Sequence, residues 1–449
     1  MSTDPSTVTA QVKPVVIPTY PPLEPDPNPM FFESRNIQGS KGNIYPRPYI
    51  DRLSGEKVER EYTAIYLENE YLQMMLLPEL GGRIFAGLDK TNGYDFFYRH
   101  KVIKPALIGL YGPWISGGVE FNWPQHHRPS TFDPTYFNIE SHPDGSKTVW
   151  MSEHEPLTRT KGMVGICLAP GKAYVETKVR LYNRTPFPQT FLWWANAGVK
   201  INDRYQVIFP PDVHYAVYHV KNPVTSYPIA KGPFTYGLDY GEGTDVSYWA
   251  NSPQASSFFA APSRYEFFGG YDHERGAGVV HLADAGISPG KKFFTWGNGG
   301  FGHQWQRNLR DASSDPAEDT GEYLELMAGV YTDNQPDFSW IMPYETRTFS
   351  QFWYPIQNIG GIKNANLRAA LNLEVTGDQA AVGVDPVEVI ENARITLTAG
   401  ARQVLLDESI DLTPGKPYLA HAALPRGVAE TDLLLRVQDA GGAEVIRYQ

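Results

Sequence analysis

Residues 321–331 have the sequence GEYLELMAGVY, in which apolar residues occupy every second position. Successive side chains of a β-strand point to opposite faces, so this alternation predicts a strand. One face would pack into a core through four apolar residues: Leu324, Leu326, Ala328 and Val330. The other face would place Glu325 between Tyr323 and Met327. This face is either an ordinary exposed surface or, as we interpret it, one wall of a sugar pocket.

Short strand patterns with glycine- and proline-rich turns fill most of the chain, and long helical periodicity is nearly absent. Such patterns lie at 63–77, 83–89, 148–152, 163–168 and 173–182. Thr91-Asn92-Gly93 predicts a hairpin turn after the second of them. The sequence therefore predicts an all-β sandwich or barrel.

Composition divides the chain into three parts. Residues 1–29 are rich in proline, which predicts an extended arm without regular structure. Residues 30–360 are dense in aromatic side chains and would form the main β domain. Residues 361–449 contain only Tyr418 and Tyr448 as aromatics, with several short strand patterns. The last part is typical of a small immunoglobulin- or fibronectin-like β-sandwich.

Charge and composition exclude several classes of protein. The net charge is -11 and no basic run occurs, which argues against nucleic-acid binding. No apolar stretch approaches the roughly 20 residues of a membrane span. The N-terminus lacks the features of a secretory signal, so we expect a cytoplasmic protein. The single cysteine, Cys167, lies in an apolar run and is expected to be a buried, unreactive thiol.

Two motifs that could indicate a cofactor or a metal do not have the context they need. Residues 297–302, GNGGFG, fit the dinucleotide pattern G-x-G-x-x-G, but no βαβ unit surrounds them. We predict a tight loop there, with Trp296 and Trp305 either bordering a pocket or only packing. His126 and His127 are adjacent and have no third ligand at a recognisable spacing, so we expect no zinc. We therefore expect neither a cofactor nor a metal.

Residues 114–129, WISGGVEFNWPQHHRP, form the stretch richest in candidate ligand-binding groups. Its two glycines permit a sharp turn or a close approach of the backbone to a ligand. It also combines aromatic faces with hydrogen-bonding groups, as small-molecule pockets do. The candidates are Trp114, Glu120, Asn122, Trp123, Gln125, His126, His127 and Arg128.

Several of these stretches resemble known proteins. Residues 77–84, LPELGGRI, resemble an early strand pair of galactose mutarotase-like proteins. Residues 117–124, 292–297 and 323–329 are similar to the bacterial family DUF5107, whose members are often joined to tetratricopeptide repeats. The resemblance covers about residues 30–360. It implies an antiparallel β-supersandwich of the galactose mutarotase-like type, with a sugar cleft on its concave face.

The resemblance also implies roles for individual residues. A mutarotase uses a glutamate on a late strand to take the proton from the anomeric hydroxyl, and Glu325 matches it, with Asp333 following. The histidine that normally protonates the ring oxygen has no counterpart in residues 191–196, where Trp194 and Asn196 stand instead. His214 and His219 could replace it only if their loop folds back.

Without that histidine, we expect two carboxylates to carry the chemistry of a glycoside hydrolase on a short oligosaccharide. The pair is Glu120 and Glu325. Glu120 is the expected acid, because flanking Trp and Phe residues would desolvate it and raise its pKa. Glu325 would be the base or nucleophile, with Glu153 and Glu155 as reserve candidates.

Two other functions stay open: an aldose 1-epimerase, and a non-catalytic sugar-binding module. In each case the expected ligand is an oligosaccharide or a monosaccharide. Whether the protein forms oligomers is left open. Six further residues are expected to contact the sugar: Trp194, Asn196, Trp296, Trp305, Tyr323 and Asp333.

Overall fold

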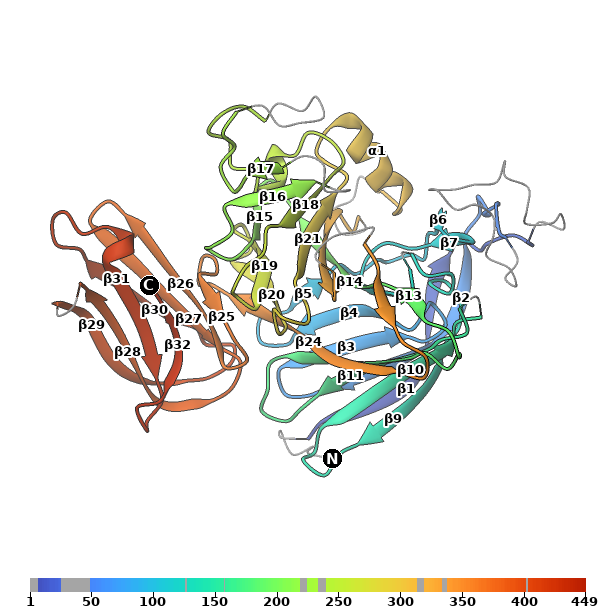
Figure 1. Ribbon diagram of the computed structural model, residues 1–449, viewed down its shortest axis with the longest axis horizontal. Coiled ribbons are helices and arrows are strands. Elements are labelled where there is room, and N and C mark those ends of the chain that lie inside the picture. The colour runs from blue at the N-terminus through green and yellow to red at the C-terminus, as the bar shows by residue number, and fades with distance from the viewer. Residues whose placement is uncertain are drawn as a thin grey trace.

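The computed structural model describes residues 7–25, 49–125, 127–156, 158–218, 224–232, 240–312, 319–332, 337–400 and 403–449. These residues are almost entirely β-structure and form a large sandwich followed by a small one (Figure 1). Neighbouring strands of both large sheets run antiparallel. The predicted all-β fold class is confirmed.

The first large sheet has 12 strands, in the order β1-β2-β3-β4-β8-β14-β22-β21-β18-β16-β17, with β5 paired to β4. The bounds are β1 (Thr9–Thr19), β2 (Val58–Glu68), β3 (Leu72–Leu77), β4 (Arg83–Asp89), β5 (Tyr94–Phe97), β8 (Val119–Asn122), β14 (Trp193–Ile201), β16 (Tyr215–Tyr218), β17 (Val224–Ser226), β18 (Ser256–Ala260), β21 (Gly290–Thr295) and β22 (Glu322–Val330). The stretch that opened the sequence analysis is thus a central strand of this sheet.

The second large sheet has eight strands, in the order β15-β19-β20-β24-β12-β11-β10-β9. The bounds are β9 (Tyr136–Ser141), β10 (Lys147–His154), β11 (Lys161–Leu168), β12 (Val175–Tyr182), β15 (Tyr205–Ile208), β19 (Phe267–Asp272), β20 (Ala277–Leu282) and β24 (Thr346–Gln357). Two small two-stranded sheets pair β6 (Ala106–Gly109) with β7 (Gly112–Trp114), and β13 (Gln189–Phe191) with β23 (Ser339–Ile341).

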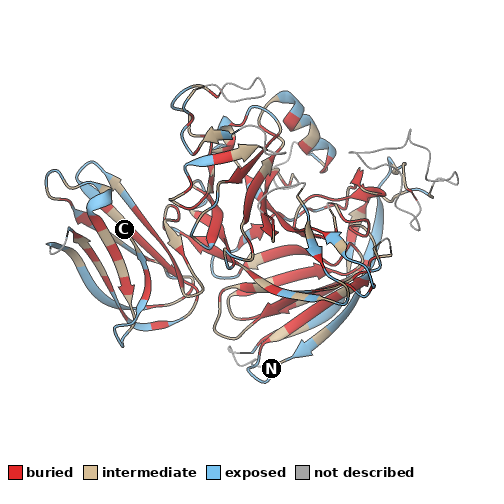
Figure 2. Cartoon of the chain, viewed as in Figure 1, coloured by how far each residue is buried: buried red, intermediate tan, exposed pale blue. Residues whose placement is uncertain are grey.

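The main core lies between the two large sheets. Leu324, Leu326, Ala328 and Val330 of β22 share one buried cluster with residues of β11 and β12 in the facing sheet. The alternation of β22 therefore turns Tyr323, Glu325 and Met327 to the opposite face of the 12-stranded sheet. That face is also covered at its centre, since β14 and β22 are buried along nearly their whole length (Figure 2).

The C-terminal sandwich has a core of its own, separate from the main one. Its two four-stranded sheets are β25-β26-β27-β30 and β29-β28-β31-β32. The bounds are β25 (Asn364–Ala365), β26 (Ala369–Thr376), β27 (Gln379–Pro386), β28 (Ile390–Ala399), β29 (Gln403–Leu412), β30 (Tyr418–Ala423), β31 (Leu433–Gln438) and β32 (Glu444–Tyr448). A shared apolar cluster that includes Tyr354, Ile362 and Val387 packs the two sandwiches together.

Two local expectations were wrong. Part of the proline-rich N-terminus, residues 9–19, is not irregular: it forms β1, which pairs with β2 along its whole length. Pro14 and Pro18 are tolerated because β1 is an edge strand, where a missing N–H need not break a ladder hydrogen bond.

The second error concerns the glycine-rich stretch 297–302, for which we expected a tight loop. A tight turn is present, but a helix follows it. Gly297 has a φ of +80°, and a Cβ there would lie 2.5 Å from the backbone of Gln254. The helix α1 (Gly300–Asn308) begins three residues later. The described chain also contains two short 3-10 helices, η2 (Trp249–Asn251) and η3 (Glu430–Asp432). No helix in the described residues has the length and apolar character needed to cross a membrane.

Candidate functional site

The candidate site lies on the face of the 12-stranded sheet that is turned away from the main core. Cross-strand partners share a face, and the register pairs Glu120 of β8 with Asn196 of β14. Asn196 in turn pairs with Met327 of β22, and Met327 pairs with Lys292 of β21. Glu325 lies on the same face, two residues along β22. Glu120 and Glu325 are thus separated by two strand spacings, roughly 10 Å across the sheet.

Glu120 is surrounded by hydrogen-bond donors. Its Oε2 accepts from Trp114 Nε1 at 3.0 Å, from Asn122 Nδ2 at 3.3 Å and from His127 Nδ1 at 3.0 Å. Its Oε1 accepts from Thr131 Oγ1 at 2.6 Å. The side chain is only 5% exposed. Four donors occupy a buried carboxylate, which leaves it little capacity to bind or protonate a substrate.

This environment stabilises the ionised form of Glu120. Burial favours the protonated form, but the charge and hydrogen bond of His127, the charge of Arg83 and the hydrogen bond of Thr131 together lower its pKa well below the usual range. The expectation that Glu120 has a raised pKa, on which its assignment as the acid rested, was wrong. Glu120 also lies on a strand rather than in a loop.

Glu325 has the opposite character. It is 6% exposed, and among the described residues its one hydrogen bond is a long contact of 3.5 Å from the Tyr323 hydroxyl. Burial raises its pKa to about 7; the charge of Glu120 adds to this, while His127, Lys292 and Arg83 oppose it. Glu325 is therefore a carboxyl group that can change protonation state near neutral pH.

The site holds two buried cations that the sequence analysis did not identify. Lys292 Nζ lies 4.8 Å from the ring centre of Phe259 and 6.0 Å from that of Trp194. Burial lowers the pKa of Lys292 to about 7, against the opposing effect of Glu325. The sequence signal that could have identified Lys292 is its position on the non-core face of a predicted strand.

The second buried cation is Arg83, which hydrogen-bonds to backbone carbonyl groups. Its Nη1 donates to the carbonyl oxygens of Ile115 and Gly117, at 2.9 and 3.0 Å. It therefore fixes the turn that precedes β8 and places Glu120. Arg83 lies within LPELGGRI, but nothing in that stretch alone indicates where its side chain points.

Several polar groups on this face lack a partner among the described residues. Both amide atoms of Asn196 are buried without a hydrogen bond, as are Asn122 Oδ1 and Trp194 Nε1. Buried polar atoms are rarely left unpaired, so each such group suggests a site for a ligand or a water molecule. Asn196 stands between the strands that carry Glu120 and Glu325.

Other residues predicted to bind the ligand lie outside the group of side chains that contacts Glu120. Trp123 packs in the main core, and Arg128 donates to the carbonyl of Gly81, so neither is grouped with Glu120. The stacked rings of Trp296 and Trp305 lie 4.7 Å apart, and Trp296 Nε1 donates to Tyr323 Oη at 3.2 Å.

The remaining candidates divide into two groups. The reserve carboxylates are engaged elsewhere, Glu153 by Ser130 and Glu155 by Thr158. His126, His219 and Asp333 lie outside the described residues. No cluster of three or more His, Cys, Asp or Glu side chains suited to a metal ion occurs in the part of the chain that the structure describes.

Comparison with known proteins assigns the family. The model described as "Domain of unknown function (DUF5107)" matches residues 40–356. The chain belongs to the DUF5107 family. A second model, described as "YphG-like protein, second domain", matches residues 364–448 of this DUF5107 protein. The predicted family is confirmed.

Solved structures similar to the DUF5107 protein include a TPR-domain containing protein from Parabacteroides distasonis, with 21% identity and a TM-score of 0.65. That match covers 78% of this chain and 55% of the other, so the chain spans about half the length of that relative. A galactose mutarotase-like protein from Clostridium acetobutylicum has 10% identity and a TM-score of 0.43, with coverage of 66% and 96%.

Proposed function

We propose that this DUF5107 protein is a carbohydrate-active enzyme that moves protons at the anomeric centre of an aldose, in the manner of an aldose 1-epimerase. The observation that carries the proposal is the contrast between the two glutamates. Glu325 is buried, weakly hydrogen-bonded and has a pKa near neutrality, as a general base requires. Glu120 is ionised and occupied by four donors.

His127 supplies the second proton-transfer group. Its Nδ1–H donates to the ionised Glu120 at 3.0 Å, which fixes the ring orientation, and we assign the second proton transfer to Nε2. His127 thus takes the role of the histidine missing from residues 191–196, from a different part of the chain.

The reaction follows from these two groups. Glu325 takes the proton from the anomeric hydroxyl, a carbonyl forms at C1, and the bond from C1 to the ring oxygen breaks. His127 gives its proton to the ring oxygen. Rotation about the C1–C2 bond and the reverse proton transfers close the ring as the other anomer. Asn196, Asn122 and Trp194 have the unpaired polar atoms that would hold the sugar hydroxyls.

Glycoside hydrolysis by Glu120 and Glu325 has less support. A glycosidase needs one carboxylic acid that is protonated at the start of the reaction, opposite a carboxylate. Glu325 could supply the protonated carboxyl group, but the ionised Glu120 is occupied by four donors and does not suit the role of base or nucleophile.

The test is the rate at which freshly dissolved single anomers of glucose, galactose and other aldoses equilibrate, measured by polarimetry or by NMR exchange spectroscopy. We expect Glu325→Gln and His127→Gln to lower the catalysed rate by about 10²- to 10⁴-fold. Glu140→Gln, at an exposed position of β9, is the matched control and should keep the wild-type rate. No acceleration of any aldose, or full activity of Glu325→Gln, would reject the proposal.

A further inference from the structure

A cavity with a strongly basic lining lies beside α1. It has a volume of about 720 Å³. Among the described residues, five basic side chains and one acidic side chain line it: Lys57, Lys101, Lys104, Arg307, Arg310 and Asp311. They come from the segment before β2, the segment between β5 and β6, and the end of α1 with the residues after it. On a chain with a net charge of -11, such a concentration of cations is a local exception.

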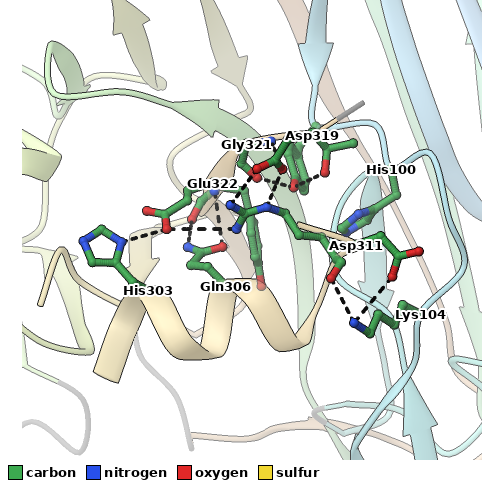
Figure 3. A network of polar contacts seen from close by, with 12 residues as sticks. His100, Lys104, His303, Gln306, Asp311, Asp319, Gly321 and Glu322 are labelled. Atoms are coloured by element: carbon green, nitrogen blue, oxygen red, sulfur yellow. Dashed lines mark hydrogen bonds and ion pairs between the residues drawn. The ribbon is translucent and has the colours of Figure 1, made fainter. Parts of the chain in front are cut away.

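Asp311 holds two of the ammonium groups together. Lys57 Nζ lies 2.7 Å from Asp311 Oδ2, and Lys104 Nζ lies 3.5 Å from Asp311 Oδ1. Lys104 also donates to the carbonyl oxygen of Arg310 at 3.0 Å (Figure 3). One carboxylate cannot neutralise both lysines, so the pair retains a positive charge in a fixed place.

The positive charge of Arg310 is balanced by two carboxylates, Asp319 and Glu322. Its Nε and Nη2 donate to Asp319 at 2.7 and 3.2 Å, and its Nη1 lies 4.0 Å from Glu322 (Figure 3). Asp319 and Glu322 therefore offset the charge of Arg310, whereas Lys57 and Lys104 share the single carboxylate of Asp311. Among the described residues, the charge that a ligand would meet comes from Lys57, Lys104 and Arg307.

We propose that this cavity binds a small, multiply charged oxyanion, such as a phosphate-bearing or polycarboxylate metabolite. Its volume falls in the range of roughly 300–1,000 Å³ that small-molecule sites occupy. Lysines act as point charges for phosphate and carboxylate oxygens, and clustered cations of one sign raise the local concentration of anions. The proposal goes beyond the proposed sugar chemistry and does not depend on it.

The cavity is distinct from the site around Glu325. Thr320 lines the cavity, and its hydroxyl accepts a hydrogen bond from Tyr98 Oη at 3.0 Å. The Tyr98 ring stacks on Tyr323, with centroids 5.2 Å apart, and Tyr323 faces Glu325. A pair of buried rings therefore separates the two sites.

The proposal is tested by isothermal titration calorimetry with inorganic pyrophosphate and with citrate, at low ionic strength. We expect saturable binding of at least one probe, which weakens as salt is added. Lys57→Met and Lys104→Met should each weaken it at least fivefold. Asp311→Asn should bind more tightly than wild type, because it removes a negative charge from the lining. Lys416→Met, an exposed lysine of the C-terminal sandwich, is the control.

The two probes separate the possible ligands. Preference for pyrophosphate would indicate a phosphate-bearing ligand, and preference for citrate a polycarboxylate. The proposal would be overturned if neither probe showed saturable binding. It would also be overturned if Lys57→Met and Lys104→Met bound like the Lys416→Met control. Thermal melts of each variant establish that the fold is intact, and binding is read independently of any sugar turnover.

Discussion

At the scale of single residues, the site shows how two glutamates on one sheet face acquire opposite properties. Both are buried, and burial alone would raise both pKa values. Glu120 is surrounded by donors from residues 114–131, whereas within the described residues Glu325 has only a long hydrogen bond from Tyr323. The charges and hydrogen bonds around each carboxylate together, rather than its depth, decide which one can exchange a proton.

The pKa of Glu325 makes a prediction about pH. A base must be ionised, so kcat/KM for anomer interconversion should rise with pH, with a midpoint near pH 7, and level off above it. Lys292→Met removes a cation that favours the ionised form, so it should move the midpoint to higher pH. Lys291→Met is the control, because Lys291 is also buried but points to the opposite face of β21. An unchanged or lower midpoint in Lys292→Met would contradict this role.

Asn196 makes a prediction that separates binding from stability. Asn196 is 3% exposed, and its amide has no hydrogen bond among the described residues. Asn196→Ala therefore breaks no hydrogen bond among them. We expect the free energy of unfolding to change by no more than about 1 kcal/mol, while kcat/KM falls roughly 10- to 100-fold through lost bonds to the substrate. Chemical denaturation and initial rates measure the two quantities. A large loss of stability with unchanged activity would show that the amide has a purely structural role.

At the scale of elements, the alternation of β22 was predictable from the sequence because it depends only on the geometry of one strand. The core face and the position of Glu325 followed from it. The donors to Glu120 were not predictable as a set, because Trp114 precedes β8 while His127 and Thr131 follow it, and they meet only through the paths of the segments on either side of β8. Arg83 fixes the first of these segments. Helix α1 was missed because nine residues with two glycines give little periodic signal.

The close packing of β14, β21 and β22 can be tested at Gly329. A Cβ at Gly329 of β22 would lie 2.5 Å from Cζ2 of Trp194, the ring beneath Lys292. Gly329→Ala must therefore displace this indole, and should destabilise the protein by about 1–3 kcal/mol and lower activity. Gly377→Ala is a control for destabilisation without effect on the site, since its φ of +64° strains any side chain in a distant turn. Wild-type activity in Gly329→Ala would argue against a role for the Trp194 ring.

At the scale of the whole molecule, the two sandwiches meet around a buried carboxyl group. Asp385 of β27 accepts a hydrogen bond from the backbone N–H of Gln357, at the end of β24, at 2.7 Å. The Gln357 side chain donates to Thr91, and Thr91 donates to Asp89. Two carboxylates from the two sandwiches thus approach each other across the interface, where ionisation of both is unfavourable.

Asp385 should make the stability of the protein depend on pH. Burial and the charge of Asp89 raise its pKa to about 8, although the Gln357 N–H opposes this. The folded state therefore holds a proton that the unfolded chain releases near pH 4. Stability should fall as pH rises from about 4 to about 8 and level off above that. Asp385→Asn cannot ionise, so at pH 9 it should be more stable than wild type by a few kcal/mol, and at pH 4 nearly equal to it, on the order of 1 kcal/mol or less. Thermal denaturation across this pH range measures the difference, with Asp378→Asn, at an exposed position, as the control. If the stability of wild type and of Asp385→Asn depended on pH in the same way, Asp385 would be ionised in the folded protein and the prediction would be wrong.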